Sequence, residues 1–89
     1  MNSVISFVEF ENQVISATYR NLAYGATVVL VDNASGQQLS EPVTRIASRH
    51  PAGTVRIRLP SSVTAGTYFL RALNGHGSHV AQSLRFEIA

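Results

Sequence analysis

Short runs of alternating apolar and polar residues, separated by turn residues, extend along the whole chain and limit what it can fold into. The clearest run covers residues 54–59, where three aliphatic side chains alternate with Arg56 and Arg58. A period of two places successive side chains on opposite faces of a strand. No segment has the sustained apolar period of a helix, so the sequence predicts an all-β chain.

Turn residues divide the chain into about seven expected strands. Asx residues and Gly36 indicate a hairpin loop at 32–36, and proline and glycine indicate a turn at 50–53. The expected strands cover residues 4–10, 13–20, 27–31, 42–49, 54–59, 67–73 and 80–88, with a short segment at 37–40. This many short strands in 89 residues predicts a single domain, residues 1–89, built as a sandwich of two sheets.

The composition excludes several classes of site. The chain has no cysteine, which rules out disulfides, thiolate metal sites and cysteine nucleophiles. All seven basic residues are arginine, and a net charge of +2 is too small to indicate binding to nucleic acid or membrane. No apolar run reaches membrane-spanning length and no signal peptide precedes the first strand. We therefore expect no membrane insertion, and a cytoplasmic location unless the chain is excised from an exported protein.

The segment from residue 59 to residue 88 carries a family-like pattern. It reads Leu59-Pro60, then Gly66-Thr67-Tyr68-x-Leu70-x-Ala72, Asn74-Gly75 and Ser83-x-x-Phe86-x-Ile88. The pattern resembles the C-terminal half of bacterial immunoglobulin-like modules, either of the IPT/TIG kind or of serine/threonine-rich cell-wall anchored proteins. The resemblance implies an immunoglobulin-like Greek-key sandwich without a disulfide, in which Tyr68 is the corner tyrosine. It also implies a spacer or a unit that binds protein or carbohydrate, and it brings no catalytic residues.

Histidines are the first candidates for chemistry. His76 and His79 lie in one glycine-rich loop and His50 lies in another turn. Zinc requires three or four converging ligands, and a sandwich of this kind is expected to place the two loops at opposite ends. Ser78, between two histidines, has no carboxylate nearby that would orient a base. We therefore predict a protein that is not an enzyme and that holds no metal or cofactor.

Four arginines are predicted to share one sheet face: Arg45, Arg49, Arg56 and Arg58. If residues 50–53 form a tight turn, Arg45 lies opposite Arg58 on the neighbouring strand, and two such charges repel. We therefore expect an anion there, which is Glu41, a neighbouring chain or a ligand. Guanidinium groups that extend separately into water are the alternative interpretation. No aromatic residues lie between these arginines, so nucleic acid is not favoured.

Apolar residues are expected on an outer sheet face. If Tyr68 points into the core, Phe69 and Leu73 point outward, and the neighbouring strand adds Val29 and Val31. Contiguous apolar surface usually marks a partner, although isolated exposed apolar residues are normal.

The sequence therefore predicts a non-catalytic protein-interaction or assembly module that forms homo-oligomers or docks on a larger protein. Two alternatives stay open. Carbohydrate binding would use Tyr19 and Tyr24 for stacking, although sugar-binding faces usually present several exposed aromatic residues. Weak anion or nucleic-acid binding would use the predicted arginine face.

Overall fold

The computed structural model describes residues 3–47, 49–50, 52–60 and 63–88, without the side chains of residues 7–8 and 40–43. β1 (Val4–Glu11), β2 (Val14–Arg20) and β5 (Ala52–Arg58) form one sheet in the order β1-β2-β5. The other sheet has the order β4-β3-β6-β7 and consists of β3 (Thr27–Asp32), β4 (Gln38–Arg45), β6 (Gly66–Leu73) and β7 (His79–Gln82), with β8 (Phe86–Ile88) also paired to β6. All these pairs are antiparallel, which confirms the predicted all-β fold of two sheets.

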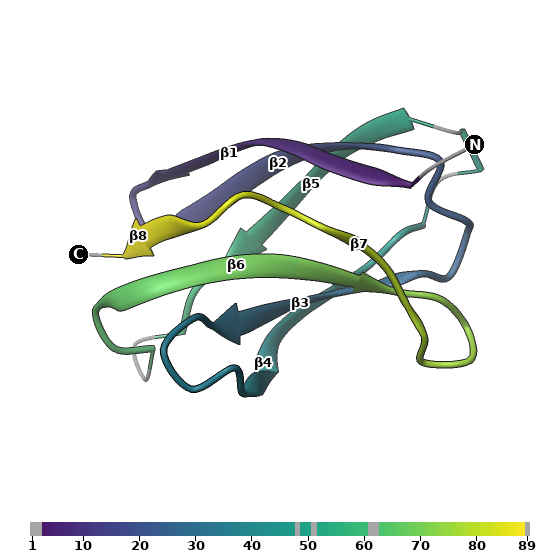
Figure 1. Cartoon of the computed structure of the whole chain (residues 1–89). Coiled ribbons are helices and arrows are strands. Elements are labelled where there is room, and N and C mark those ends of the chain that lie inside the picture. The colour runs from purple at the N-terminus through teal and green to yellow at the C-terminus, as the bar shows by residue number, and fades with distance from the viewer. Residues whose placement is uncertain (1–2, 48, 51, 61–62, 89) are drawn as a thin grey trace.

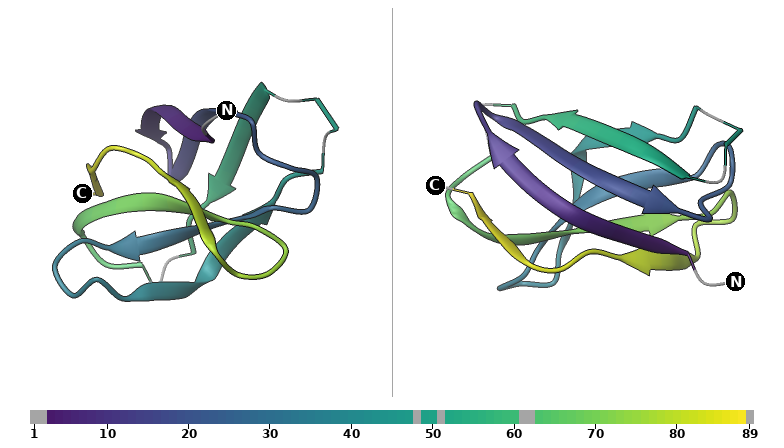
Figure 2. Two further views of the ribbon diagram at one scale, coloured as in Figure 1. Left: turned by 45° about the vertical axis from the view of Figure 1, so that its right-hand side comes forward. Right: turned by 90° about the horizontal axis from the view of Figure 1, so that it is seen from above.

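The two sheets form two layers with the apolar core between them (Figures 1 and 2). β2, β3, β5 and β6 each contribute alternate residues to this core, as the period of two requires. Ile15, Ala17 and Tyr19 of β2 are buried, for example, whereas Thr18 and Arg20 are exposed. The alternation predicted for residues 54–59 is confirmed in the same way. The largest fully buried side chains are Val28, Leu30, Val31, Ile15, Ile46 and Leu70.

The hairpin predicted between strands 42–49 and 54–59 is wrong. β4 pairs with β3, with Arg45 opposite Thr27, and β5 pairs with β2, with Arg58 opposite Val14. The chain therefore crosses from one sheet to the other between β4 and β5. Alternation fixes the face on which a side chain lies, but it does not identify the neighbouring strand.

The predicted boundaries also differ at β4. Residues 37–40 and 42–49 were expected as separate segments, but β4 runs without interruption from Gln38 to Arg45 and includes Pro42. Proline has no amide hydrogen to donate, so it is tolerated mainly in edge strands. β4 is the edge strand of its sheet, which explains why the proline does not end it.

The strand predicted at 80–88 is divided into β7 and β8 by a break that contains Ser83. Ser83 is 6% exposed, and its Oγ accepts a hydrogen bond of 2.8 Å from the Leu70 amide. The same hydroxyl donates to the Leu84 carbonyl at 2.9 Å. The Ser83 amide in turn donates to the Leu70 carbonyl at 2.9 Å. A side-chain oxygen thus replaces a backbone acceptor in the ladder, and both short strands remain on β6.

Tyr68 forms the corner contact that the sequence predicted. Its hydroxyl donates a hydrogen bond of 2.8 Å to the Thr64 carbonyl, four residues earlier, and the residue is 4% exposed. The ring therefore holds the turn before β6 against the core.

Replacing Tyr68 by phenylalanine is expected to lower the free energy of unfolding by about 1 kcal/mol, because one partly buried hydrogen bond is lost while the ring stays. Urea unfolding measures the change. Tyr24→Phe is the matched control, since Tyr24 is 60% exposed, and it should change stability by less than about 0.5 kcal/mol. Equal effects of the two substitutions would show that the corner bond contributes nothing.

Candidate functional site

The apolar outer face of the β4-β3-β6-β7 sheet consists of Val29, Val31, Phe69 and Leu73. The first three form an apolar cluster separate from the main core, and Leu73 packs against it. Val31 lies opposite Phe69 on the neighbouring strand. These residues alternate with core residues such as Leu30 and Leu70, so they point away from the other sheet.

This face is less exposed than the sequence predicted. Val29 is 4% exposed, Val31 0% and Phe69 7%, so the expectation of an exposed apolar surface at these three residues is wrong. The chain covers them itself, and only Leu73 is half-buried. Strand alternation predicts the direction of a side chain but not what its neighbours cover.

Arg71 crosses the apolar outer face. It lies opposite Val29, and its guanidinium carbon is 5.4 Å from the centre of the Phe69 ring. Its Nε is buried and has no hydrogen-bond partner in the described part of the chain. A long arginine side chain can cover apolar surface with its stem, but a buried donor without an acceptor is costly.

The four predicted arginines do not share one face of a strand pair. Arg45 belongs to β4, at the edge of one sheet, whereas Arg56 and Arg58 belong to β5, at the edge of the other. Arg49 lies outside the strands, with its guanidinium carbon 4.8 Å from the centre of the Tyr24 ring. The predicted patch was wrong because it depended on the β4–β5 hairpin.

Arg45 and Arg56 nevertheless line one open hollow, between the edges of β4 and β5. Its volume is about 360 Å³, and Thr44, Thr54 and Tyr19 also line it. No acidic residue lies among its described lining. The side chain of Glu41, one of the anions considered from the sequence, lies outside the part that the structure describes.

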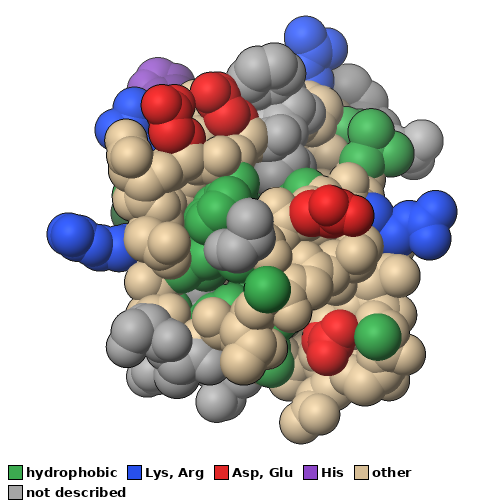
Figure 3. Space-filling view, turned by 90° about the vertical axis from the view of Figure 1, so that its left-hand side faces the viewer, with side chains coloured by type: hydrophobic (Ala, Val, Ile, Leu, Met, Phe, Trp, Pro, Cys, Tyr) green, Lys and Arg blue, Asp and Glu red, His purple; other side chains and the backbone are tan. Residues whose placement is uncertain are grey.

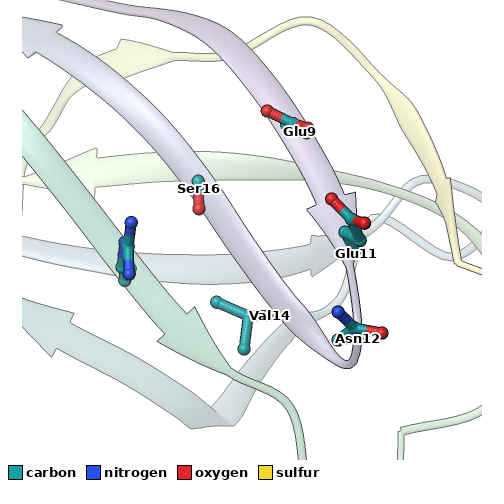
Figure 4. A pocket seen from close by; sticks show the side chains of 6 residues that line it. Glu9, Glu11, Asn12, Val14 and Ser16 are labelled. Atoms are coloured by element: carbon teal, nitrogen blue, oxygen red, sulfur yellow. The ribbon is translucent and has the colours of Figure 1, made fainter.

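The outer face of the β1-β2-β5 sheet carries both signs of charge. We call it the charged face and define it by Glu9, Glu11, Arg56 and Arg58, which are all exposed. Figure 4 shows the two glutamates along β1, with Val14 and Ser16 on the neighbouring strand and Asn12 at the turn. These five labelled residues and Arg56 line an open hollow of about 300 Å³.

The two glutamates were not among the candidate site residues predicted from the sequence. Residues 4–10 have apolar side chains at both sets of alternating positions, so alternation alone does not predict the outward position of Glu9. The register of β1 against β2 is also irregular, because β1 has an extra residue between Ser6 and Glu9. The signal that could have found them is the pair of glutamates two residues apart, which share one strand face.

The loop histidines form no site among the described residues. Both His76 and His79 are exposed, but His79 is the first residue of β7 and only His76 lies in the loop before it. Asn74 organises this loop by accepting hydrogen bonds from the amides of His76 and Ser78 at 2.8 and 3.0 Å. His50 lies in another loop. No group of three His, Asp or Glu residues in the described chain is placed to hold a metal ion.

The two tyrosines considered for sugar stacking also separate. Tyr24 is 60% exposed, but Tyr19 is 4% exposed and belongs to the core. Stacking on a sugar requires an exposed ring face, so Tyr19 cannot contribute to it in this structure.

Figure 3 shows one end of the molecule, where acidic and basic side chains lie around a small group of apolar ones.

Comparison with protein-family models gives no match, and comparison with curated proteins gives none either. The described residues include no helix that has the length and apolarity needed to cross a membrane.

Proposed function

We propose that the chain is a non-catalytic interaction module that docks on another protein, either a second copy or a larger partner, through the apolar outer face. The observation that carries the proposal is the second apolar cluster of Val29, Val31 and Phe69, on the side of the sheet that the sandwich core does not use. A sandwich needs only one apolar face per sheet, so the packing of the two sheets does not explain this second apolar cluster.

Arg71 indicates the chemistry of that partner. Its Nε is buried, beside the Phe69 ring and the half-buried Leu73, and finds no acceptor among the residues that the structure describes. A partner that brings an apolar group with a carboxylate or carbonyl next to it would satisfy the guanidinium and cover Leu73 at the same time. Both contacts would then contribute to the free energy of binding.

Leu73→Ser should weaken this docking by about 1 kcal/mol or more, because the variant removes apolar area that the partner would bury. A photo-crosslinking amino acid at position 73 provides the direct measurement, since the mass of the product separates a second copy from a larger partner. The same amino acid at position 84 is the control, because Leu84 is 85% exposed and lies outside the apolar outer face. No product at 73, or the same products at both positions, would contradict the proposal.

We infer also that the sandwich is of the immunoglobulin-like type. The strand orders β1-β2-β5 and β4-β3-β6-β7 support this assignment, as does the Tyr68 corner. The hollow lined by Arg45 and Arg56 favours weak anion binding as a second candidate function. Carbohydrate binding has less support, because Tyr19 lies in the core.

A further inference from the structure

The charged face is divided into an acidic edge and a basic edge, row by row. Ser16 of β2 lies opposite Glu9 on one side and Arg56 on the other. In the next row, Val14 lies between Glu11 and Arg58. Neighbouring strands are about 4.8 Å apart, and β2 lies between the glutamate and the arginine of each row. The backbone of each glutamate is therefore about 10 Å from the backbone of the arginine in its row.

The charges of these two rows are not paired with one another in the structure. The described residues contain no ion pair between either glutamate and either arginine, although all four side chains are exposed. Ser16 and Val14, which lie between the two edges, have shorter side chains than the glutamates and arginines beside them. The middle of the face is therefore hollow. The face therefore presents two rows of opposite, separated charges to a partner.

We propose that the charged face pairs with the same face of a second copy of this chain, about a twofold axis parallel to β2. Such an axis places β1 of one copy over β5 of the other. Glu9 then faces Arg56 of the second copy and Glu11 faces Arg58, and symmetry repeats both contacts. An axis perpendicular to the strands would instead place β1 over β1 and β5 over β5, so that like charges meet.

The dimensions of the side chains suit this arrangement. Sheets that pack face to face lie about 10 Å apart, a gap that a glutamate and an arginine extended from opposite sides can span together. The hollow above Ser16 remains in the middle and holds water, as polar interfaces commonly do. A three-stranded face of seven-residue strands measures only about 14 by 24 Å, so the pairing is weak and reversible.

Arg20 is the unfavourable element of the pairing. It lies on β2, on the same outer face, opposite Val4 of β1 and Ala52 of β5. A twofold axis parallel to β2 brings Arg20 of the two copies toward each other, at the end of the face away from the glutamates. The arrangement therefore predicts that removing this charge strengthens the dimer.

This inference is independent of the proposed function, because the charged face and the apolar outer face belong to different sheets. Pairing through the charged face leaves the apolar outer face of each copy directed away from the other. The pair would thus present two docking faces, and a partner with two sites would bind it with higher avidity.

Sedimentation equilibrium on the full chain, at low salt and over a wide concentration range, tests the proposal. The wild type should dimerise, and salt at about 1 M, where the Debye length is about 3 Å, should weaken the dimer. Glu9→Arg with Glu11→Arg should raise the dissociation constant by about tenfold or more, as should Arg56→Glu with Arg58→Glu. An equimolar mixture of these two variants should dimerise again, and so should one chain that carries all four substitutions.

Arg20→Ser is the matched surface variant and should lower the dissociation constant. Thermal unfolding of each variant shows whether a lost dimer reflects weaker pairing or an unfolded chain. The mixture of the two double variants is a second control, since two unfolded chains would not restore the dimer. A wild type that stays monomeric at every concentration would overturn the proposal. So would a dimer whose dissociation constant is unchanged in both double variants. Leu73→Ser leaves these charges intact, so a dimer that it alone disrupts supports the proposed function and contradicts this inference.

Discussion

Ser83→Ala should unfold at a clearly lower urea concentration than the wild type, with a loss of about 1–3 kcal/mol in the free energy of unfolding. The loss is larger than that of an ordinary surface hydrogen bond because the Leu70 amide, which donates to Ser83 Oγ at 2.8 Å, would stay buried without an acceptor. Leu70 is 0% exposed, so water does not replace the hydroxyl. Alanine also removes the donor to the Leu84 carbonyl.

Amide hydrogen exchange locates the effect. In the variant the Leu70 amide should lose protection more strongly than the other amides of β6, because it is the group that loses its acceptor. Ser78→Ala is the matched control, since Ser78 is exposed in a loop and its bonds to Asn74 use only its backbone amide and carbonyl. Wild-type stability in Ser83→Ala would mean that the break between β7 and β8 does not depend on the serine.

Gly53→Ala should lower the free energy of unfolding by about 1–3 kcal/mol, which is the cost typical of overpacking. A methyl group on Gly53 would lie 2.7 Å from Tyr19 Oη and 2.9 Å from its Cζ. Tyr19 lies directly opposite Gly53 on β2 and is 4% exposed, so its ring has little room to move. Backbone entropy alone would favour alanine in a strand by about 0.5–1 kcal/mol, so the sign of the change decides between the two effects.

A double-mutant cycle with Tyr19→Leu isolates the contact. In the Tyr19→Leu background Gly53→Ala should become neutral or stabilising, because the ring that it would strike is gone. Gly75→Ala is the control, since no atom lies within 4 Å of a Cβ placed there. An alanine at 53 that stabilises the wild-type chain would show that the ring moves aside without cost.

Much of the fold could be predicted from alternation alone. The residues that point inward in β5 and β6 were identified because a period of two fixes the face. The neighbours of β4 and β5 could not be identified in this way, since Arg45 and Arg58 fit a hairpin as well as they fit two separate sheets. The break at Ser83 was also missed, because the sequence alternates as one regular strand would, with Leu84, Phe86 and Ile88 inward and Ser83, Arg85 and Glu87 outward. In the structure Ser83 is buried and Leu84 is 85% exposed.

The candidate sites were predicted less well, for related reasons. The direction of Phe69 and Leu73 followed from the strand, and alternation also places Arg71 on that face. The position of the Arg71 guanidinium 5.4 Å from the centre of the Phe69 ring depends on side-chain packing, which alternation does not predict. The charged face depends on β2 lying between β1 and β5. Only that order places Glu9 and Arg56 in one row, and the order is a property of the whole chain.

One consequence of the topology concerns mechanical load. The described chain begins at one end of the molecule with β1 and finishes at the opposite end with β8, and these two strands belong to different sheets (Figures 1 and 2). Tension on the two ends would draw β1 lengthwise past β2 and β8 lengthwise past β6. Because ladder hydrogen bonds are perpendicular to the strands, such a pull shears several of them together instead of peeling them apart singly. Unfolding the chain by tension on its ends therefore requires the hydrogen bonds of a strand pair to break together.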